Sequence, residues 1–168
     1  MTRSFRHAAL AALIALAPLT AAAAPAEVGT PALAWQSVGT LSPAAGYAEN
    51  IGVAGLVQGT FGDCIIVGGG ANFPDGGPLT GGAKVTYPDV YVLRATAAGL
   101  TETDHAQMPY PVAYGVSVTT PDGVLYFGGS TDETGARAVT RLTAPNGKLH
   151  TETLPALPFA LQNGVAAY

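Results

Sequence analysis

The polar side chains best placed to meet a ligand lie in one long loop, residues 71–86. The loop carries Asn72, Asp75 and Lys84 among glycines, and Tyr87 follows directly after it. Long loops on a rigid scaffold are where proteins most often bind their ligands. We therefore take these four side chains as candidate substrate-binding residues. In the alternative interpretation, the Asn and Asp form Asx-type turns and the Lys is simply solvated.

Other reactive side chains do not form a recognisable site in the sequence. The glycines at 68–70 lack the Gly-Lys-Ser/Thr continuation of a phosphate loop, so nucleotide binding is not expected. His105 and His150 lie far apart in polar, turn-rich stretches, and with one Cys and no pair of His at metal-ligand spacing a metal site is unsupported. The single cysteine, Cys64, stands in an apolar run and is expected to be a buried small hydrophobe. We expect no metal and no cofactor.

The elements that would position this loop recur along the chain. The first unit contains predicted strands at 51–57, 64–67 and 89–93. The second contains predicted strands at 114–118, 124–127 and 138–142, and a third unit begins at 158–168. In both complete units the middle strand runs into consecutive glycines. Equivalent glycines are about 50–60 residues apart, near the kelch period of about 50.

This recurring unit predicts the fold class. Glycines after a strand admit neighbouring backbone or adopt positive φ; one such pair is an ordinary turn, but two in matching context indicate a repeat. We therefore expect an all-β, kelch-type β-propeller over residues 47–168, preceded by a lead-in segment at 25–46. Propellers have about 4–8 blades of four strands, so this length predicts an incomplete ring of about two to three blades.

The amino terminus has the pattern of a secretory signal peptide. Basic Arg3 and Arg6 precede the apolar run 8–17, and a small-residue tract follows at 21–26. An uncleaved anchor is disfavoured because the run is shorter than the roughly 20 residues that span a bilayer. Cleavage after Ala24 or after Ala26 fits the tract equally well. We assign residues 1–24 to a cleaved signal and expect a periplasmic or secreted protein that is not held in a membrane.

Composition narrows the classes of partner. The chain has 48% hydrophobic residues together with 22 Gly and 13 Pro, which favours short strands joined by turns over disorder. The 7 basic residues are scattered and outnumbered by 11 acidic ones, so no basic stripe is available for nucleic acid.

One string is more specific than the repeat itself. Residues 69–75 read Gly-Gly-Ala-Asn-Phe-Pro-Asp, and this string resembles the N-acetylneuraminate epimerase (sialic acid mutarotase) family. The chain is most similar to the cyclically permuted branch of that kelch-type family. The similarity extends over residues 51–168, with further matches at 52–55, 81–84, 89–93 and 109–117.

The resemblance implies a six-bladed, often exported propeller that interconverts the α and β anomers of sialic acid. Opening the sugar ring requires a base at the anomeric hydroxyl and an acid at the ring oxygen, and a cation would hold the carboxylate. In the permuted order, the family's catalytic Glu and Arg are expected in a blade beyond Tyr168. The resemblance therefore assigns no catalytic residue here, and this fragment is expected to be inactive alone.

Two further expectations remain open. Because fold does not dictate function, the alternative is a non-catalytic kelch module that binds a glycan or a protein. An incomplete ring also leaves apolar blade faces and sheet edges uncovered, so we expect the chain to associate with itself.

Overall fold

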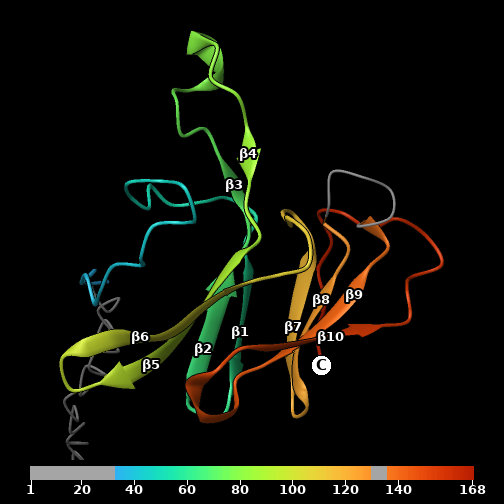
Figure 1. Cartoon of the computed structure of the whole chain (residues 1–168). Helices are drawn as coiled ribbons and strands as arrows, with labels where there is room; N and C mark the ends of the chain where they lie inside the picture. The colour runs from blue at the N-terminus through green and yellow to red at the C-terminus, as the bar shows by residue number, and fades with distance from the viewer. Residues whose placement is uncertain (1–32, 130–135) are drawn as a thin grey trace, which may run out of the picture. The chain divides into compact units, whose positions relative to one another are not determined.

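The computed structural model describes residues 33–129 and 136–168. The predicted signal peptide, residues 1–24, lies outside this range. Residues 36–168 form one compact unit, which contains two four-stranded antiparallel sheets and a two-stranded hairpin (Figure 1). The prediction of an all-β chain is confirmed, and the two sheets are consistent with blades of a partial β-propeller.

Both large sheets are built as meanders. The first has the order β1–β2–β5–β6 and consists of β1 (Val57–Phe61), β2 (Cys64–Gly68), β5 (Asp89–Thr96) and β6 (Gly99–Gln107). The second has the order β10–β9–β8–β7 and consists of β7 (Val116–Thr120), β8 (Gly123–Phe127), β9 (Val139–Thr143) and β10 (His150–Leu154).

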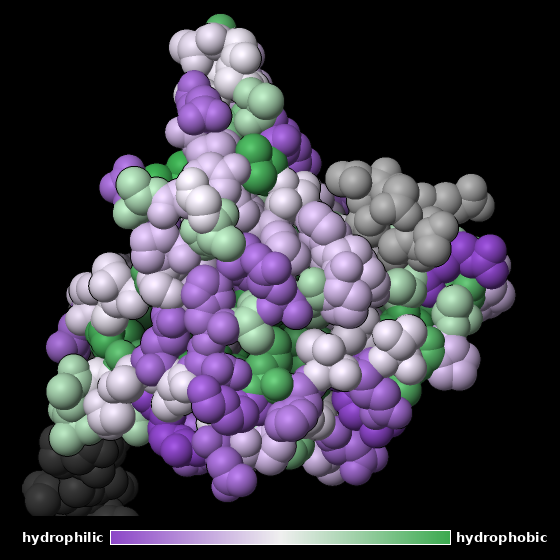
Figure 2. All heavy atoms as spheres, viewed as in Figure 1, coloured by the Kyte–Doolittle hydropathy of each residue, from purple (hydrophilic) through white to green (hydrophobic). Residues whose placement is uncertain are grey.

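The predicted loop at 71–86 contains structure of its own. β3 (Ala71–Asn72) pairs with β4 (Val85–Thr86), and the 3-10 turn η1 (Pro78–Thr80) lies between them. A second 3-10 turn, η2 (Pro145–Gly147), connects β9 to β10. The segment beyond β3 and β4 projects from the sheets (Figure 1), and its surface is mostly of neutral hydropathy with a small hydrophobic area (Figure 2). Leu79 in this segment is fully exposed.

The predicted strands at 64–67, 89–93 and 124–127 are confirmed. The prediction at 51–57 is wrong in extent, because only Val57 enters β1 and the preceding residues make a single bridge, Ala54 to Ala71. Among the described residues after Leu154 no strand forms. Within the two large sheets, β6 and β10 were not predicted, since their sequences are mostly polar.

The two sheets share one core because each sheet directs alternate side chains of its strands towards the other sheet. In the first sheet Val57 and Ile66 are fully buried, and in the second Val124 and Tyr126 are. β1 contacts both β7 and β8, so these side chains meet between the sheets. Burying a large apolar side chain contributes about 1.5–3 kcal/mol, which makes this shared core a main source of stability.

The glycines after β2 and β8 make the same turn twice. Gly69 and Gly128 have φ of 59° and 63°, and their N–H groups donate to Asp89 O at 2.7 Å and Ala138 O at 2.8 Å. The next glycines, at 70 and 129, have φ of 84° and 75° and donate to Val112 O and Leu161 O. Each pair therefore ties the second strand of its sheet to the third strand and to the chain that leads onward. The repeat predicted from these glycines is confirmed.

Three residues in the left-handed region mark the start of successive units. Gly55, Tyr114 and Asn163 have φ of 67°, 62° and 53°. The Tyr114 N–H donates to Gly55 O at 2.8 Å, and the Asn163 N–H donates to Tyr114 O at 2.7 Å. These bonds place the described residues after 157 in the position where a third unit would begin.

Residues 38–50, here called the strap, lie on the face of the first sheet that points away from the second. Leu100 N donates to Val38 O at 2.8 Å, and Ala45 N donates to Asp89 Oδ1 at 3.2 Å. The Ser42 hydroxyl donates to the Glu102 carboxylate, at 2.8 Å from Oε1. The strap thus runs along β6 towards the start of β5. Within the described part of the chain, no helix has the length and apolar character needed to cross a bilayer.

Candidate functional site

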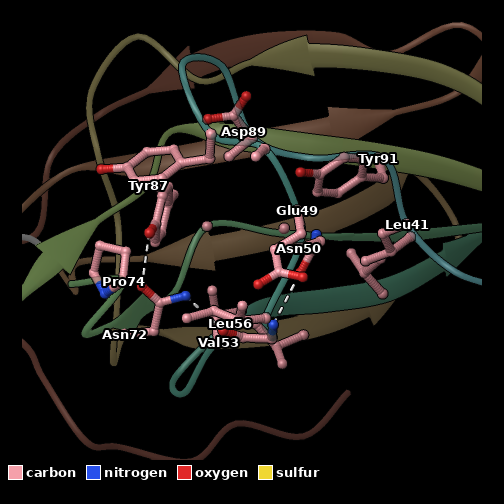
Figure 3. A pocket seen from close by; sticks show the side chains of 18 of the residues that line it. Leu41, Glu49, Asn50, Val53, Leu56, Asn72, Pro74, Tyr87, Asp89 and Tyr91 are labelled. Carbon is pink, nitrogen blue, oxygen red and sulfur yellow. Dashed lines mark hydrogen bonds between the residues drawn. The ribbon is translucent and has the colours of Figure 1, made fainter. Parts of the chain in front are cut away.

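A cavity of about 540 Å³ opens at the end of β2, between the strap, the chain that follows it and the loop after β3 (Figure 3). The residues that line it come from these three segments and from β2, β3 and β5. They are Leu41, Ala44, Tyr47, Ala48, Glu49, Asn50, Ile51, Gly52, Val53, Leu56, Val67, Gly68, Gly69, Asn72, Pro74, Asp75, Tyr87, Asp89 and Tyr91.

The alternation of β5 decides which side chains face the cavity. Val90 and Val92 point into the core between the sheets and are fully buried. Asp89 and Tyr91 therefore point to the opposite face, where they line the cavity together with Val67 of β2. The same strand thus builds both the core and the site.

Asp89 is held firmly although it is almost fully buried, at 3% exposure. Its Oδ1 lies 2.8 Å from His105 Nε2 and accepts from Ala45 N. The imidazole stacks on Tyr91 with ring centroids 4.5 Å apart. Neither Asp89 nor His105 was a predicted site residue. His105 lies in β6 and not in a turn, and the pairing of β5 with β6 brings the two side chains together.

Ser42 completes a row of polar groups behind Asp89, but the arrangement is not a nucleophilic triad. The Ser42 Oγ lies 3.3 Å from His105 Nδ1, and its hydroxyl proton points to the Glu102 carboxylate. A serine that donates to a carboxylate is not deprotonated by the histidine. The row instead fixes the strap to the sheet and orients the imidazole against Asp89.

Asn72 and Tyr87, two of the predicted site residues, meet at the cavity. The Tyr87 hydroxyl donates to Asn72 Oδ1 at 2.6 Å, and Asn72 Nδ2 donates to Gly52 O at 2.7 Å. The second bond reaches a residue far along the chain, so this Asn braces two segments and does not make the local Asx turn considered above. Burial raises the pKa of the Tyr87 phenol, and the neighbouring Tyr47 raises it further.

The other two predicted residues take different positions. Asp75 is exposed and lines the cavity. Lys84 is exposed and does not line it, because its Nζ lies over the ring of Tyr114, 4.2 Å from the centroid. The structure therefore brings three of the four predicted residues to the cavity and turns the cation away from it.

The charge around the cavity is of one sign. Glu49, Asp75 and Asp89 are among the lining residues, and the lining contains no Lys, Arg or His. Burial raises the pKa of the Tyr91 phenol, and the charge of Asp89 beside it acts in the same direction. No group of three or more His, Cys, Asp or Glu side chains within residues 33–129 and 136–168 is arranged to hold a metal ion.

Cys64 lies away from the cavity. Its side chain is 1% exposed within the core between the sheets, and its Sγ is 3.6 Å from an Arg94 guanidinium nitrogen. The prediction that this cysteine is a buried core residue is confirmed.

The sequence of the chain is similar to those of curated proteins named N-acetylneuraminate epimerase. The chain is 37% identical over 133 residues to the N-acetylneuraminate epimerase of Yersinia enterocolitica, a match that covers 71% of this chain and 32% of that protein. It is 33% identical over 118 residues to the Pasteurella multocida enzyme of the same name, covering 62% of this chain and 30% of that protein. It is 32% identical over 123 residues to the Brucella melitensis enzyme, covering 68% and 31%.

No family model matches the chain. The chain spans about one third of the length of the curated relatives that it matches. Most of each relative therefore has no counterpart in these residues.

Proposed function

We propose that this chain, which belongs to the N-acetylneuraminate epimerase family, is part of a sugar mutarotase. The mutarotase would interconvert the α and β anomers of N-acetylneuraminate. The observation that carries the proposal is the match to curated enzymes of that name, which reaches 37% identity and extends over 71% of the chain. Relatives from three bacterial genera agree in name and in the extent of the match.

The described residues supply only part of what this reaction needs. Ring opening requires a general base, a general acid and a cation for the sugar carboxylate. The cavity offers carboxylates and phenols, but Asp89 is engaged with His105, and Lys84 lies on Tyr114 outside the cavity. The proposal therefore places the acid, the base and the cation in a longer protein that contains this chain.

Export of the protein and its propeller fold belong to the same proposal. The signal-like residues 1–24 support export to the periplasm or beyond. The kelch-like glycine turns, repeated 59 residues apart at Gly69 and Gly128, support a propeller in which these sheets are two blades. We propose the cyclically permuted order on the grounds of the motif positions alone.

The exchange of anomers tests the proposal directly. The α anomer of N-acetylneuraminate, freshly released by a sialidase, is followed by proton NMR as it converts to the β anomer. The 168-residue chain should match buffer, and the protein from the uninterrupted reading frame that includes any residues encoded after Tyr168 should accelerate exchange. Acceleration by the 168-residue chain would contradict the assignment of the catalytic groups elsewhere. No acceleration by the longer protein would contradict the mutarotase.

A second candidate, a non-catalytic module that binds a glycan, is favoured by one observation. The cavity has many hydrogen-bonding groups and no cation, which suits binding without acid–base turnover. A sugar that binds to both forms of the protein without any exchange of anomers would select this candidate.

A further inference from the structure

The cavity on the first sheet is mismatched with an anionic ligand. Glu49, Asp75 and Asp89 lie in its lining, and no basic side chain does. The one cation of the neighbouring loop, Lys84, is occupied by the Tyr114 ring. A ligand carboxylate placed in this cavity would face like charges at short range, and such juxtapositions reduce affinity substantially.

The cavity presents three carboxylates to which a ligand can donate hydrogen bonds. The carboxylates of Glu49 and Asp75 make no hydrogen bond or ion pair with residues 33–129 and 136–168. Asn72 donates one of its two amide protons to Gly52 O, and the Tyr87 hydroxyl donates to Asn72 Oδ1. The hydroxyls of Tyr47 and Tyr91 also line the cavity and can donate or accept. The carboxylates favour a ligand that brings donors, and hydroxyl groups are common uncharged donors.

The buried carboxylate of Asp89 also favours a ligand that donates hydrogen bonds. Its Oδ1 accepts hydrogen bonds from His105 and Ala45, which leaves Oδ2 as the oxygen that can meet a ligand in the cavity. A ligand hydroxyl that donates to Oδ2 would form a charge-assisted hydrogen bond. Because Asp89 is braced by His105, the oxygen is already oriented before a ligand arrives.

The remaining surface of the cavity is aromatic and apolar. Tyr47 and Tyr87 meet edge to face with centroids 5.3 Å apart, and Tyr91 lies on the far side in Figure 3. Phenol rings pack well on the C–H faces of a pyranose. The volume, about 540 Å³, lies within the roughly 300–1,000 Å³ typical of small-molecule sites.

We propose that this cavity binds an uncharged polyhydroxylated sugar and excludes sugar carboxylates. The inference goes beyond the proposed mutarotase activity, because it assigns to this sheet a site that selects against the charge of N-acetylneuraminate. The acid group of that sugar is consequently held elsewhere, or the sugar that binds here is a different one. Binding alone tests the inference, so its outcome is separate from the exchange of anomers.

The matched probes are N-acetylneuraminate and its methyl ester, which differ in the charge of the acid group and by one methyl group. Isothermal titration of the full chain at pH 7 and low salt should show the ester binding at least about fivefold more tightly. The difference should shrink as salt is added. Equal or tighter binding of the acid, or no measurable binding of the ester, would overturn the proposal.

Charge variants locate the selectivity. Asp75→Asn should bring the affinity of the acid closer to that of the ester, because one rim charge is removed. Asp122→Asn makes the same change in the exposed turn between β7 and β8 and should leave the ratio unchanged. The same ratio in both variants would contradict a role for the cavity.

A filling variant tests the location independently of charge. Ala48 lines the cavity and is exposed, so Ala48→Trp can occupy the space without disturbing the core. Binding of the ester should be lost in this variant, while the circular dichroism spectrum and thermal melt stay close to those of the parent. Unchanged binding in a folded Ala48→Trp protein would overturn the assignment to this cavity.

Discussion

The two sheets have the same strand order and the same glycine turns, and the cavity described above lies on the first. Between its second and third strands the first sheet inserts residues 69–88, which include the hairpin β3–β4. The strap covers the outer part of its free face. In the second sheet the equivalent connection spans residues 128–138. The comparison teaches that one scaffold repeats, and that the additions to its first copy create the site.

The largest predicted loss of stability concerns the second glycine after β8, compared with the equivalent glycine after β2. A Cβ on Gly129 would meet backbone of Gly115 and the Tyr126 hydroxyl, whereas a Cβ on Gly70 would meet mainly the side chain of Val53, 2.6 Å away. Since backbone cannot yield, Gly129→Ala should lower the free energy of unfolding by about 3–5 kcal/mol. Gly70→Ala should cost about 1–2 kcal/mol. Urea denaturation measures both, and equal losses would show that the two turns are equally packed.

A second prediction compares two buried phenols. The Tyr126 hydroxyl accepts from Gly115 N at 3.0 Å in the core, whereas Tyr91 faces the cavity. Tyr126→Phe leaves that N–H without a partner and should cost about 1–3 kcal/mol at pH 7. Tyr91→Phe should cost less than about 0.5 kcal/mol. Chemical denaturation of the two variants beside the parent provides the test, and a larger loss for Tyr91 would reverse the comparison.

The raised pKa of Tyr126 also predicts that the free energy of unfolding falls at alkaline pH. Burial raises the pKa of Tyr126 to about 12, while in the unfolded chain it titrates near 10. Between these values the unfolded state releases a proton that the folded state keeps, so stability falls as pH rises, by about 2–3 kcal/mol in total. In Tyr126→Phe the free energy of unfolding should fall less between pH 10 and pH 12 than in the parent. An equal fall in that variant would assign the effect to other tyrosines.

A smaller effect is expected where the two sheets are linked by charge. Asp104 of β6 accepts from Leu149 N at 2.8 Å and from Lys148 Nζ at 3.0 Å, and the Leu149 N–H in particular lowers the pKa of this carboxyl. Its contribution is present above the unfolded pKa and is lost as pH falls through the lowered folded pKa. Asp104→Asn should cost about 1 kcal/mol at pH 7 and little in acid.

Glu152 provides the control, because its pair with Arg141 at 3.2 Å is within the second sheet and largely exposed. Glu152→Gln should change stability by less than about 0.5 kcal/mol. If both variants lose the same amount, Asp104 does not link the sheets in solution.

The repeat could be predicted from the sequence because glycines at 69–70 and 128–129 occupy positions that need positive φ and close packing. The strands with apolar alternation were recognisable for the same local reason. β6 and β10 were not, since one has half-buried polar residues and the other is an exposed edge, and neither shows a hydrophobic pattern.

The cavity was predictable only in part. Asn72, Asp75 and Tyr87 stood out in a polar loop, and the loop does reach the cavity. The pairing of Asp89 with His105, and the approach of the strap, depend on register between distant segments. The alternation at 89–93 was the one local signal that Asp89 and Tyr91 share a face. Lys84 was grouped with the others because sequence proximity says nothing about which side of a hairpin a side chain takes.

The central claim is that the first sheet binds ligand and the second is scaffold. A ¹⁵N-labelled sample of the chain titrated with the methyl ester of N-acetylneuraminate tests it most directly. Amide shifts should cluster at residues 47–53, 72–75 and 87–91 and leave residues 116–127 unchanged. Shifts centred on the second sheet, or none at all, would contradict the account.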